Sequence, residues 1–95
     1  MKYVIDIDNT ICHTVGSDYS HSQPIRQRIS LVNQLYSNGH HITYWTARGS
    51  NSGQDWSRLT AQQLEDWGCR YHELRMGKPA YDVWVDDKAQ WIFDS

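Results

Sequence analysis

Blocks of apolar and polar residues alternate along the chain and predict strands separated by helices. An apolar run at about residues 3–7 predicts a first strand, and the polar stretch NTICHTVGSDYSHSQ after it is typical of a loop. From Pro24 to Gly39, apolar residues recur at helical spacing and predict an amphipathic helix. The β-branched and aromatic run HITYW at residues 41–45 predicts a second strand.

The second half of the chain repeats this alternation. The expected elements are a helix from about Gln54 to Trp67 that ends at Gly68, a short strand around Tyr71 to Leu74, a last strand at residues 83–85, and one or two helical turns in the tail KAQWIFDS. Such an order predicts an α/β fold with a parallel sheet of about four strands and helices on both faces. We therefore expect residues 1–95 to form a single domain, a small Rossmann-like sandwich of three layers.

Composition is that of a soluble globular protein. The chain has 95 residues, of which 39% are hydrophobic and 21% are charged. No apolar run approaches the roughly 20 residues that cross a bilayer, and a strand that begins at residue 2 or 3 leaves no room for a cleavable signal peptide. We therefore expect a cytoplasmic protein without a membrane partner. Cys12 and Cys69 lack a CxxC or CxxH companion, which favours two free thiols.

The net charge argues against a nucleic-acid-binding surface, and the spacing of the histidines argues against a histidine metal site. The formal net charge is −2 and no stripe of Lys and Arg is present, which argues against a protein that holds nucleic acid by its phosphates. The five histidines show no HxxxH or HxH spacing for metal ligands. His13 and His21 are the two histidines that could contact a substrate, because their loop can overhang the ends of the strands.

Polar residues gather where the predicted strands end, which is the edge at which ligands bind to a parallel sheet. These residues are Asp6 and Asp8 after the first strand, Thr46 after the second, Asp86 and Asp87 after the last, and Lys78 in the turn before it. Four carboxylates at one edge cannot all be ionised without a divalent cation, and oxygen ligands suit Mg²⁺. Because Mg²⁺ keeps positions for water and a phosphate oxygen, we expect a phosphate substrate, with one acid as nucleophile and the other as general acid and base.

Four motifs in this order, DIDNT, YWTAR, GKP and VWVDD, resemble those of the haloacid dehalogenase (HAD) superfamily, and the resemblance spans nearly the whole chain. It implies that Asp6 attacks phosphorus to form an aspartyl phosphate, and that Asp8 protonates the leaving oxygen and later activates water. Phosphoryl transfer is favoured over dehalogenation because dehalogenases of this superfamily lack the second acid. The implied metal ligands are Asp6, Asp8, Asp86 and Asp87, with Asp86 direct and Asp87 through water. The expected substrate contacts are Asn9, Thr46, Ala47, Arg48 and Lys78, where Thr46 donates its hydroxyl and Lys78 neutralises charge.

Two details depart from the common pattern of the superfamily. Asn9 stands where Gly is usual, and Asn tolerates unusual backbone angles better than most residues. The loops after the first two strands are too short for an inserted cap domain, which indicates a capless member. Arg48 has two possible partners, a substrate anion or a nearby Asp.

The expected function is therefore that of a Mg²⁺-dependent phosphatase, a phosphoric monoester hydrolase. The stretch GKPAYDVWVDDKA is similar to small phosphatase-like proteins of capsular polysaccharide and phosphosugar loci, which suggests a sugar phosphate or another small phosphorylated metabolite. The alternatives are a phosphate-binding or regulatory module without turnover and a phosphatase of polynucleotide ends. Because no cap covers the site, we also expect a homo-oligomer, dimer or tetramer, with the loop CHTVGSDYSHSQ near the subunit boundary.

Overall fold

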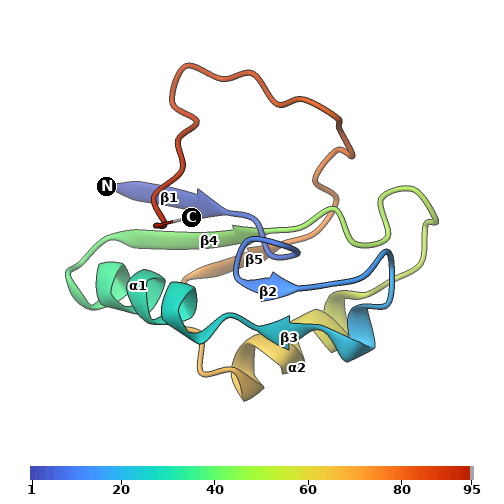
Figure 1. Cartoon of the computed structure of the whole chain (residues 1–95), viewed down its shortest axis with the longest axis horizontal. Coiled ribbons are helices and arrows are strands. Elements are labelled where there is room, and N and C mark those ends of the chain that lie inside the picture. Colours follow the sequence, from blue (N-terminus) through green and yellow to red (C-terminus); the bar gives the residue numbers. More distant parts are fainter. Residues whose placement is uncertain (95) are drawn as a thin grey trace.

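The computed structural model describes residues 1–94, which form a small α/β domain around a parallel sheet (Figure 1). The sheet has the order β1-β4-β5, and its strands are β1 (Lys2–Ile5), β4 (His41–Trp45) and β5 (Glu73–Arg75). The helices are α1 (Arg26–Ser37), between β1 and β4, and α2 (Ser57–Asp66), between β4 and β5. The loop after β1 contains a small antiparallel pair, β2 (Cys12–His13) with β3 (Gln23–Pro24), and the short 3₁₀ helix η1 (Tyr19–His21).

Both helices lie on the same side of the parallel sheet (Figure 1). The strands follow chain order across the sheet, so both crossovers step in the same direction. Crossovers between parallel strands are right-handed as a rule, and two such steps in one direction place both helices on one face. The expectation of helices on both faces is therefore wrong for residues 1–94. The chain on the other side, residues 76–94, contains turns and bends but neither a helix nor a strand.

The expected last strand at residues 83–85 is not formed, and the described sheet has three strands rather than about four. Val83 and Val85 are 78% and 90% exposed, and β1 remains an edge strand. Val and Trp are common in strands because their side chains pack well on a pleated, half-buried surface. They form a strand only where the backbone of a neighbouring strand pairs with them. Here residues 79–92, which we call the arch, rise away from the sheet and return to β1 only at their C-terminal end (Figure 1, orange to red). The helical turns expected in the tail are also absent up to residue 94.

The other expected elements are confirmed with shifted boundaries. Helix α2 begins at Ser57 rather than Gln54, and just before it the Asp55 carboxylate accepts hydrogen bonds from the Ser57 backbone N–H, at 2.9 Å, and from its hydroxyl, at 2.6 Å. Helix α1 ends at Ser37, and Gly39 follows with a φ of +91°, which suits a glycine that ends a helix.

The core lies between the sheet and the two helices and fixes where the strands end. Its fully buried side chains include Ile7, Ile42 and Tyr44 from the strands and their ends, and Val32 and Leu64 from the helices. Because these apolar residues hold β1 and β4 side by side, the polar residues that follow both strands meet at one edge of the sheet. Within residues 1–94, no helix is long and apolar enough to cross a membrane.

Candidate functional site

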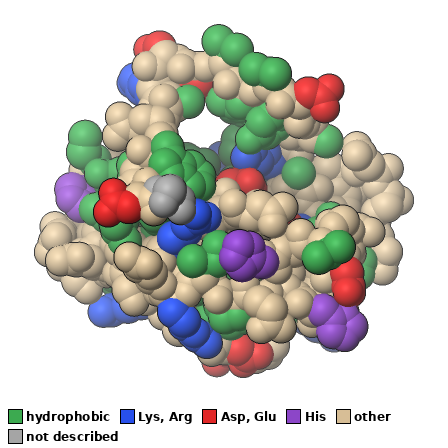
Figure 2. Space-filling view, in the orientation of Figure 1, with side chains coloured by type: hydrophobic (Ala, Val, Ile, Leu, Met, Phe, Trp, Pro, Cys, Tyr) green, Lys and Arg blue, Asp and Glu red, His purple; other side chains and the backbone are tan. Residues whose placement is uncertain are grey.

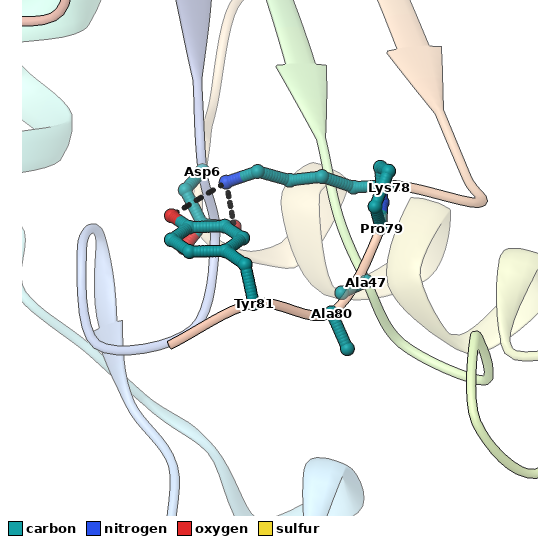
Figure 3. Close-up of a pocket in the computed structure, with 6 residues that line it drawn as sticks. All are labelled: Asp6, Ala47, Lys78, Pro79, Ala80 and Tyr81. Atoms are coloured by element: carbon teal, nitrogen blue, oxygen red, sulfur yellow. Dashed lines mark hydrogen bonds and ion pairs between the residues drawn. The ribbon is translucent and has the colours of Figure 1, made fainter. Parts of the chain in front are cut away.

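Asp6 and Lys78 meet at the carboxyl edge of the parallel sheet (Figure 3). Asp6 follows β1 and Lys78 follows β5, and the Lys78 Nζ lies 3.5 Å from the Asp6 Oδ1. The same Nζ donates a hydrogen bond of 3.3 Å to the Tyr81 hydroxyl and lies 5.0 Å from the centre of the Tyr81 ring. These three side chains line a cavity of about 330 Å³ together with Ala47, Pro79 and Ala80. The cavity therefore presents one carboxylate, one ammonium group and one phenol.

The backbone of the loop after β4 fixes the position of Lys78. The Lys78 N–H donates to the Thr46 carbonyl at 3.0 Å, and the Ser50 hydroxyl donates to the Lys78 carbonyl at 2.7 Å. Gly77 precedes Lys78 with a φ of +77°, a conformation that glycine adopts without strain. The two motifs YWTAR and GKP, far apart in the sequence, are thus joined by a direct hydrogen bond between Thr46 and Lys78.

The charges around Asp6 act in opposite directions on its carboxyl group. Burial raises the pKa of Asp6, the Lys78 ammonium lowers it, and the negative charge of Asp8 raises it again; the net result is a pKa above the usual value. A further positive charge in the cavity would stabilise the ionised form of Asp6. A reaction in which the Asp6 oxygen forms a covalent bond would remove the cost of keeping its negative charge in the partly buried site.

Asp8 turns away from this cavity and binds Arg48. The guanidinium Nη2 lies 2.8 Å from the Asp8 Oδ1, and Nε lies 3.0 Å from the Oδ2, which makes a two-point contact. The Thr14 hydroxyl donates a further hydrogen bond of 2.6 Å to the Oδ1. Asp6 and Asp8 therefore each have their own cationic partner within the chain.

Arg48 has the second of its two expected partners, an aspartate. Its side chain is completely buried, and its remaining N–H groups donate to the Thr60 hydroxyl, the Gln63 side-chain carbonyl and the Ser22 hydroxyl at 3.1, 2.6 and 3.4 Å. Every guanidinium donor is then in use, so this structure leaves none for a substrate anion.

The other expected substrate contacts occupy different positions. Ala47 lines the cavity. Thr46 is fully buried, and its hydroxyl accepts the Arg48 backbone N–H at 3.1 Å, so it acts here on the loop rather than in the cavity. Asn9 has a φ of +60°, which confirms that it adopts the conformation usual for glycine. Its side-chain carbonyl accepts the Thr14 N–H at 3.2 Å and shapes the loop after β1.

Asp86 and Asp87 lie in the arch and are exposed, because the strand that was expected to bring them to the sheet edge is not formed. The Asp86 carboxylate accepts the Lys88 backbone N–H at 2.8 Å, and this contact lowers the pKa of Asp86. Among residues 1–94, no three His, Cys, Asp or Glu side chains are grouped closely enough to hold a metal ion. In this structure the four expected metal ligands are thus not brought together.

A second, larger cavity lies between β1 and the arch, and the molecule is hollowed there in Figure 2. Its volume is about 810 Å³, and both Asp6 and Asp86 line it. Lys78, Tyr81 and Trp84 also line it, and the Lys78 Nζ lies 5.7 Å from the Trp84 ring centre. The small cavity and the large one therefore share the Asp6–Lys78 pair.

Some contacts of the two acids had no signal in the sequence. Trp84 falls in the expected last strand and Tyr81 just before it, and neither was expected to contact Lys78. Thr14, Thr60 and Gln63 are ordinary polar residues in a loop and on a helix, and only the fold brings them to Arg48 and Asp8. His13 and His21 line neither cavity, and His21 instead binds Asp18 at 2.8 Å.

Comparison with known proteins identifies a structure of similar fold but no protein of known activity. No family model matches the chain, and no curated protein matches it. A crystal structure described as an MCSG target from Vibrio cholerae is similar, with a TM-score of 0.85 and 23% sequence identity, over 94% of this chain and 81% of that one. At this identity the likeness shows the fold alone. The chain shares its α/β fold with that Vibrio cholerae protein.

Proposed function

We propose that the protein is a phosphomonoesterase of the HAD type that works through an aspartyl phosphate on Asp6. The observation that carries this proposal is the Asp6–Lys78 pair, 3.5 Å apart at the carboxyl edge of a parallel sheet, in a cavity open to a ligand. The order of the four motifs supports the same proposal. A carboxylate that faces an ammonium group suits attack on a phosphate, because the ammonium offsets the negative charge of the incoming group.

The raised pKa of Asp6 is consistent with a nucleophile. Its carboxylate is costly to keep ionised in the partly buried site, and formation of a bond to phosphorus removes that charge. The Lys78 ammonium opposes the effect of burial on the pKa of Asp6 and so favours the ionised carboxylate that attacks phosphorus. Asp8 lies two positions further along the chain and would supply and remove the proton.

Magnesium is part of the proposal, with Asp6, Asp8, Asp86 and Asp87 as the oxygen ligands. The donors fit this ion in their chemistry, because carboxylates of Asp6 and Asp86 line one cavity. Bound Mg²⁺ would polarise a phosphate oxygen and offset charge there. Asp8 is bound to Arg48 and lines neither cavity, so Asp6 and Asp86 are the two expected ligands that an ion in the large cavity would meet.

The direct test is hydrolysis of p-nitrophenyl phosphate with Mg²⁺, with EDTA, and by the variant Asp6→Asn. Loss of the nucleophile should lower the rate by several powers of ten, because the amide keeps the shape of the side chain but cannot attack phosphorus. Asp66→Asn is the matched control, since Asp66 is an exposed acid that accepts a hydrogen bond from Gln62 on α2 and lines neither cavity. Retention of more than about a tenth of the activity in Asp6→Asn would remove the nucleophile role.

A phosphate-binding module without turnover is the second proposal. It is favoured by the position of Asp8, whose carboxylate binds Arg48 and lines neither cavity of the described residues. Calorimetry with inorganic phosphate separates the two proposals. Phosphate binding that is lost in Lys78→Met, together with a wild-type protein that hydrolyses no aryl phosphate, would favour the module.

The finer features of the function are also proposals. We propose a sugar phosphate or another small phosphorylated metabolite as substrate, on the similarity of GKPAYDVWVDDKA alone. A cytoplasmic setting and a homo-oligomer complete the proposal. A screen of phosphorylated metabolites at equal concentration tests the substrate class, with glycerol phosphate as the small acyclic reference.

A further inference from the structure

We propose that the large cavity between β1 and the arch binds the part of the substrate beyond the ester oxygen, and that Trp84 stacks against a ring in that part. The ligand is a phosphate monoester that carries a polar ring, either a sugar or a base attached through its sugar. This inference rests on the proposed function for the phosphate end of the substrate and deepens it. It assigns a place and a contact to the rest of the molecule.

The two cavities meet at the Asp6–Lys78 pair, and their sizes suit different parts of one ligand. Both are lined by Asp6, Lys78 and Tyr81. The small cavity has a volume of about 330 Å³ and the large one of about 810 Å³. A phosphate held by Lys78 therefore has the larger cavity beside it for the group on its ester oxygen.

Two aromatic rings lie next to the Lys78 ammonium. The Lys78 Nζ is 5.0 Å from the centre of the Tyr81 ring and 5.7 Å from that of the Trp84 ring. Hydrogen bonds from an ammonium group to a phosphate oxygen measure about 2.7–2.9 Å. A phosphate on Lys78 therefore places its ester group within a few bonds of both rings.

Trp84 is held by edge contacts with its aromatic neighbours. Its ring meets Tyr81 at 5.1 Å and Trp45 at 6.4 Å between centres, and both pairs are edge-to-face. Neither neighbour is therefore stacked parallel to the indole. The face of an indole carries partial negative charge, so it attracts the C–H groups of a sugar ring and stacks with a base.

The arch directs different side chains toward the cavity and toward solvent. Tyr81, Trp84 and Asp86 line the large cavity, whereas Val83 and Val85 are 78% and 90% exposed. Trp84 itself is 41% exposed. A partly exposed tryptophan in the wall of a cavity that adjoins the candidate site is well placed to contact a ligand.

The opposite wall of the cavity offers backbone hydrogen-bonding groups. Residues 2–5 line the cavity, and among residues 1–94 the strand that they form, β1, pairs only with β4. The N–H and C=O groups on the other edge of β1 therefore have no strand partner. An apolar chain would cover these groups without hydrogen bonds, whereas sugar hydroxyls or the edge of a base can pair with them.

The charges in the cavity favour an anionic ligand. Three lysines and two aspartates line it, namely Lys2, Lys78, Lys88, Asp6 and Asp86. The cavity therefore has a net positive charge, which suits a phosphate ester with an otherwise neutral ring.

The experiment measures Kd by calorimetry for ribose 5-phosphate, uridine 5′-monophosphate and glycerol 2-phosphate. The first ester carries a sugar ring, the second adds a base to that sugar, and the third has no ring. All proteins carry Asp6→Asn, so that no ester is consumed. We expect at least one ring-bearing ester to bind at least about fivefold more tightly than glycerol 2-phosphate, and Trp84→Leu to remove this preference, because stacking on an aromatic side chain changes affinity by about this factor or more.

The two ring-bearing esters distinguish the two kinds of ring. Tighter binding of uridine 5′-monophosphate alone would identify the base as the ring on Trp84, and equal preference for both esters would identify the sugar. Equal Kd values for all three esters would overturn the proposal. So would an equal loss of affinity for all three in Trp84→Leu, since a merely structural role does not discriminate between ligands.

Two further variants are controls. Trp84→Phe keeps an aromatic face and should retain most of the preference. Val83→Ala changes an exposed residue of the same arch that lines neither cavity of residues 1–94, and it should leave all three Kd values unchanged. If Trp84→Leu does not fold, Trp84→Gln, whose polar side chain suits an exposed segment, decides by the same criterion.

Binding without turnover keeps this result separate from the proposed function. A wild-type protein that hydrolyses no ester, while ring-bearing esters still bind more tightly through Trp84, would overturn the phosphatase and support the ring site. A wild-type protein that hydrolyses all three esters, with no preference in Kd, would overturn the ring site alone. If none of the three esters binds, both proposals are overturned.

Discussion

Asp6 and Asp8 are separated by one residue, yet they bind different cations from different strands. Asp6 contacts Lys78 after β5, whereas Asp8 contacts Arg48 after β4. Two acids so close together at the partly buried end of an apolar strand are costly unless positive charge lies beside each of them. The chain meets this need with its own Lys and Arg, and the metal ion that the sequence suggested is not required for the two acids to coexist.

The first prediction is that Asp6→Asn stabilises the protein at neutral pH. The pKa of Asp6 is raised in the folded state, so this acid favours folding only while it is protonated. Its contribution is fully present below the unfolded value of 3.8 and is lost as the pH rises through the folded pKa. The variant should therefore unfold at a higher temperature than the wild type at pH 7.

The same comparison at low pH is the control for this prediction. At a pH below 3.8 the wild-type carboxyl group is neutral in both states, and the two midpoints should converge. A variant that is less stable than the wild type at pH 7 would mean that the Lys78 contact outweighs the cost of burial. Circular dichroism melts at several pH values measure the difference.

The second prediction concerns the pH dependence of turnover in Lys78→Met. Lys78 lowers the pKa of Asp6, and its removal leaves burial and the Asp8 charge, which both raise it. The acidic limb of kcat/KM reports ionisation of the free enzyme, and it should move to higher pH in the variant. Tyr81→Phe is the matched control, because it removes only the hydroxyl that accepts from Lys78. If the acidic limb of Lys78→Met stays at the wild-type pH, the ionisation that it reports is not that of Asp6.

The three strands of the parallel sheet and the two helices were predictable from the sequence, because apolar spacing and glycine stops are local signals. The structure confirms β4 and α1, which follow from these signals. It also confirms the unusual backbone angle expected of Asn9, which follows from its place in the motif. The arch was not predictable, since whether Val83 and Val85 pair with a neighbour depends on backbone that lies far away in the sequence.

The site was predictable in part, for a similar physical reason. Asp6 and Lys78 were expected to meet because parallel strands end at one edge of the sheet. The Arg48–Asp8 contact was one of two open alternatives, and its support from Thr60 and Gln63 depends on how α2 packs. Side-chain networks of this kind leave no periodic pattern in a sequence.

The third prediction is that Mg²⁺ stabilises the folded protein. A ligand that binds only the folded state at 100 times its Kd adds about 2.7 kcal/mol to the free energy of unfolding. Asp86→Ala should remove this increment if Asp86 is a metal ligand. Asp82→Ala is the control, because Asp82 is an exposed acid of the same arch that lines neither cavity. An equal response to Mg²⁺ in the wild type and Asp86→Ala would exclude Asp86 from the ligands.

The last prediction is that the protein associates with copies of itself through the arch. Val83, Val85 and Trp91 are 78%, 90% and 56% exposed, and apolar side chains gathered on one surface segment are typical of an interface. The loop after β1, which was expected at the boundary, instead directs Thr14 and Ser22 into buried hydrogen bonds. We therefore expect a dimer or tetramer by light scattering, and Val85→Asp should shift it toward monomer without unfolding it, because Val85 packs on nothing in the core. A wild-type monomer at working concentration that hydrolyses small phosphate esters efficiently would contradict both the association and the need for a second copy to cover the site.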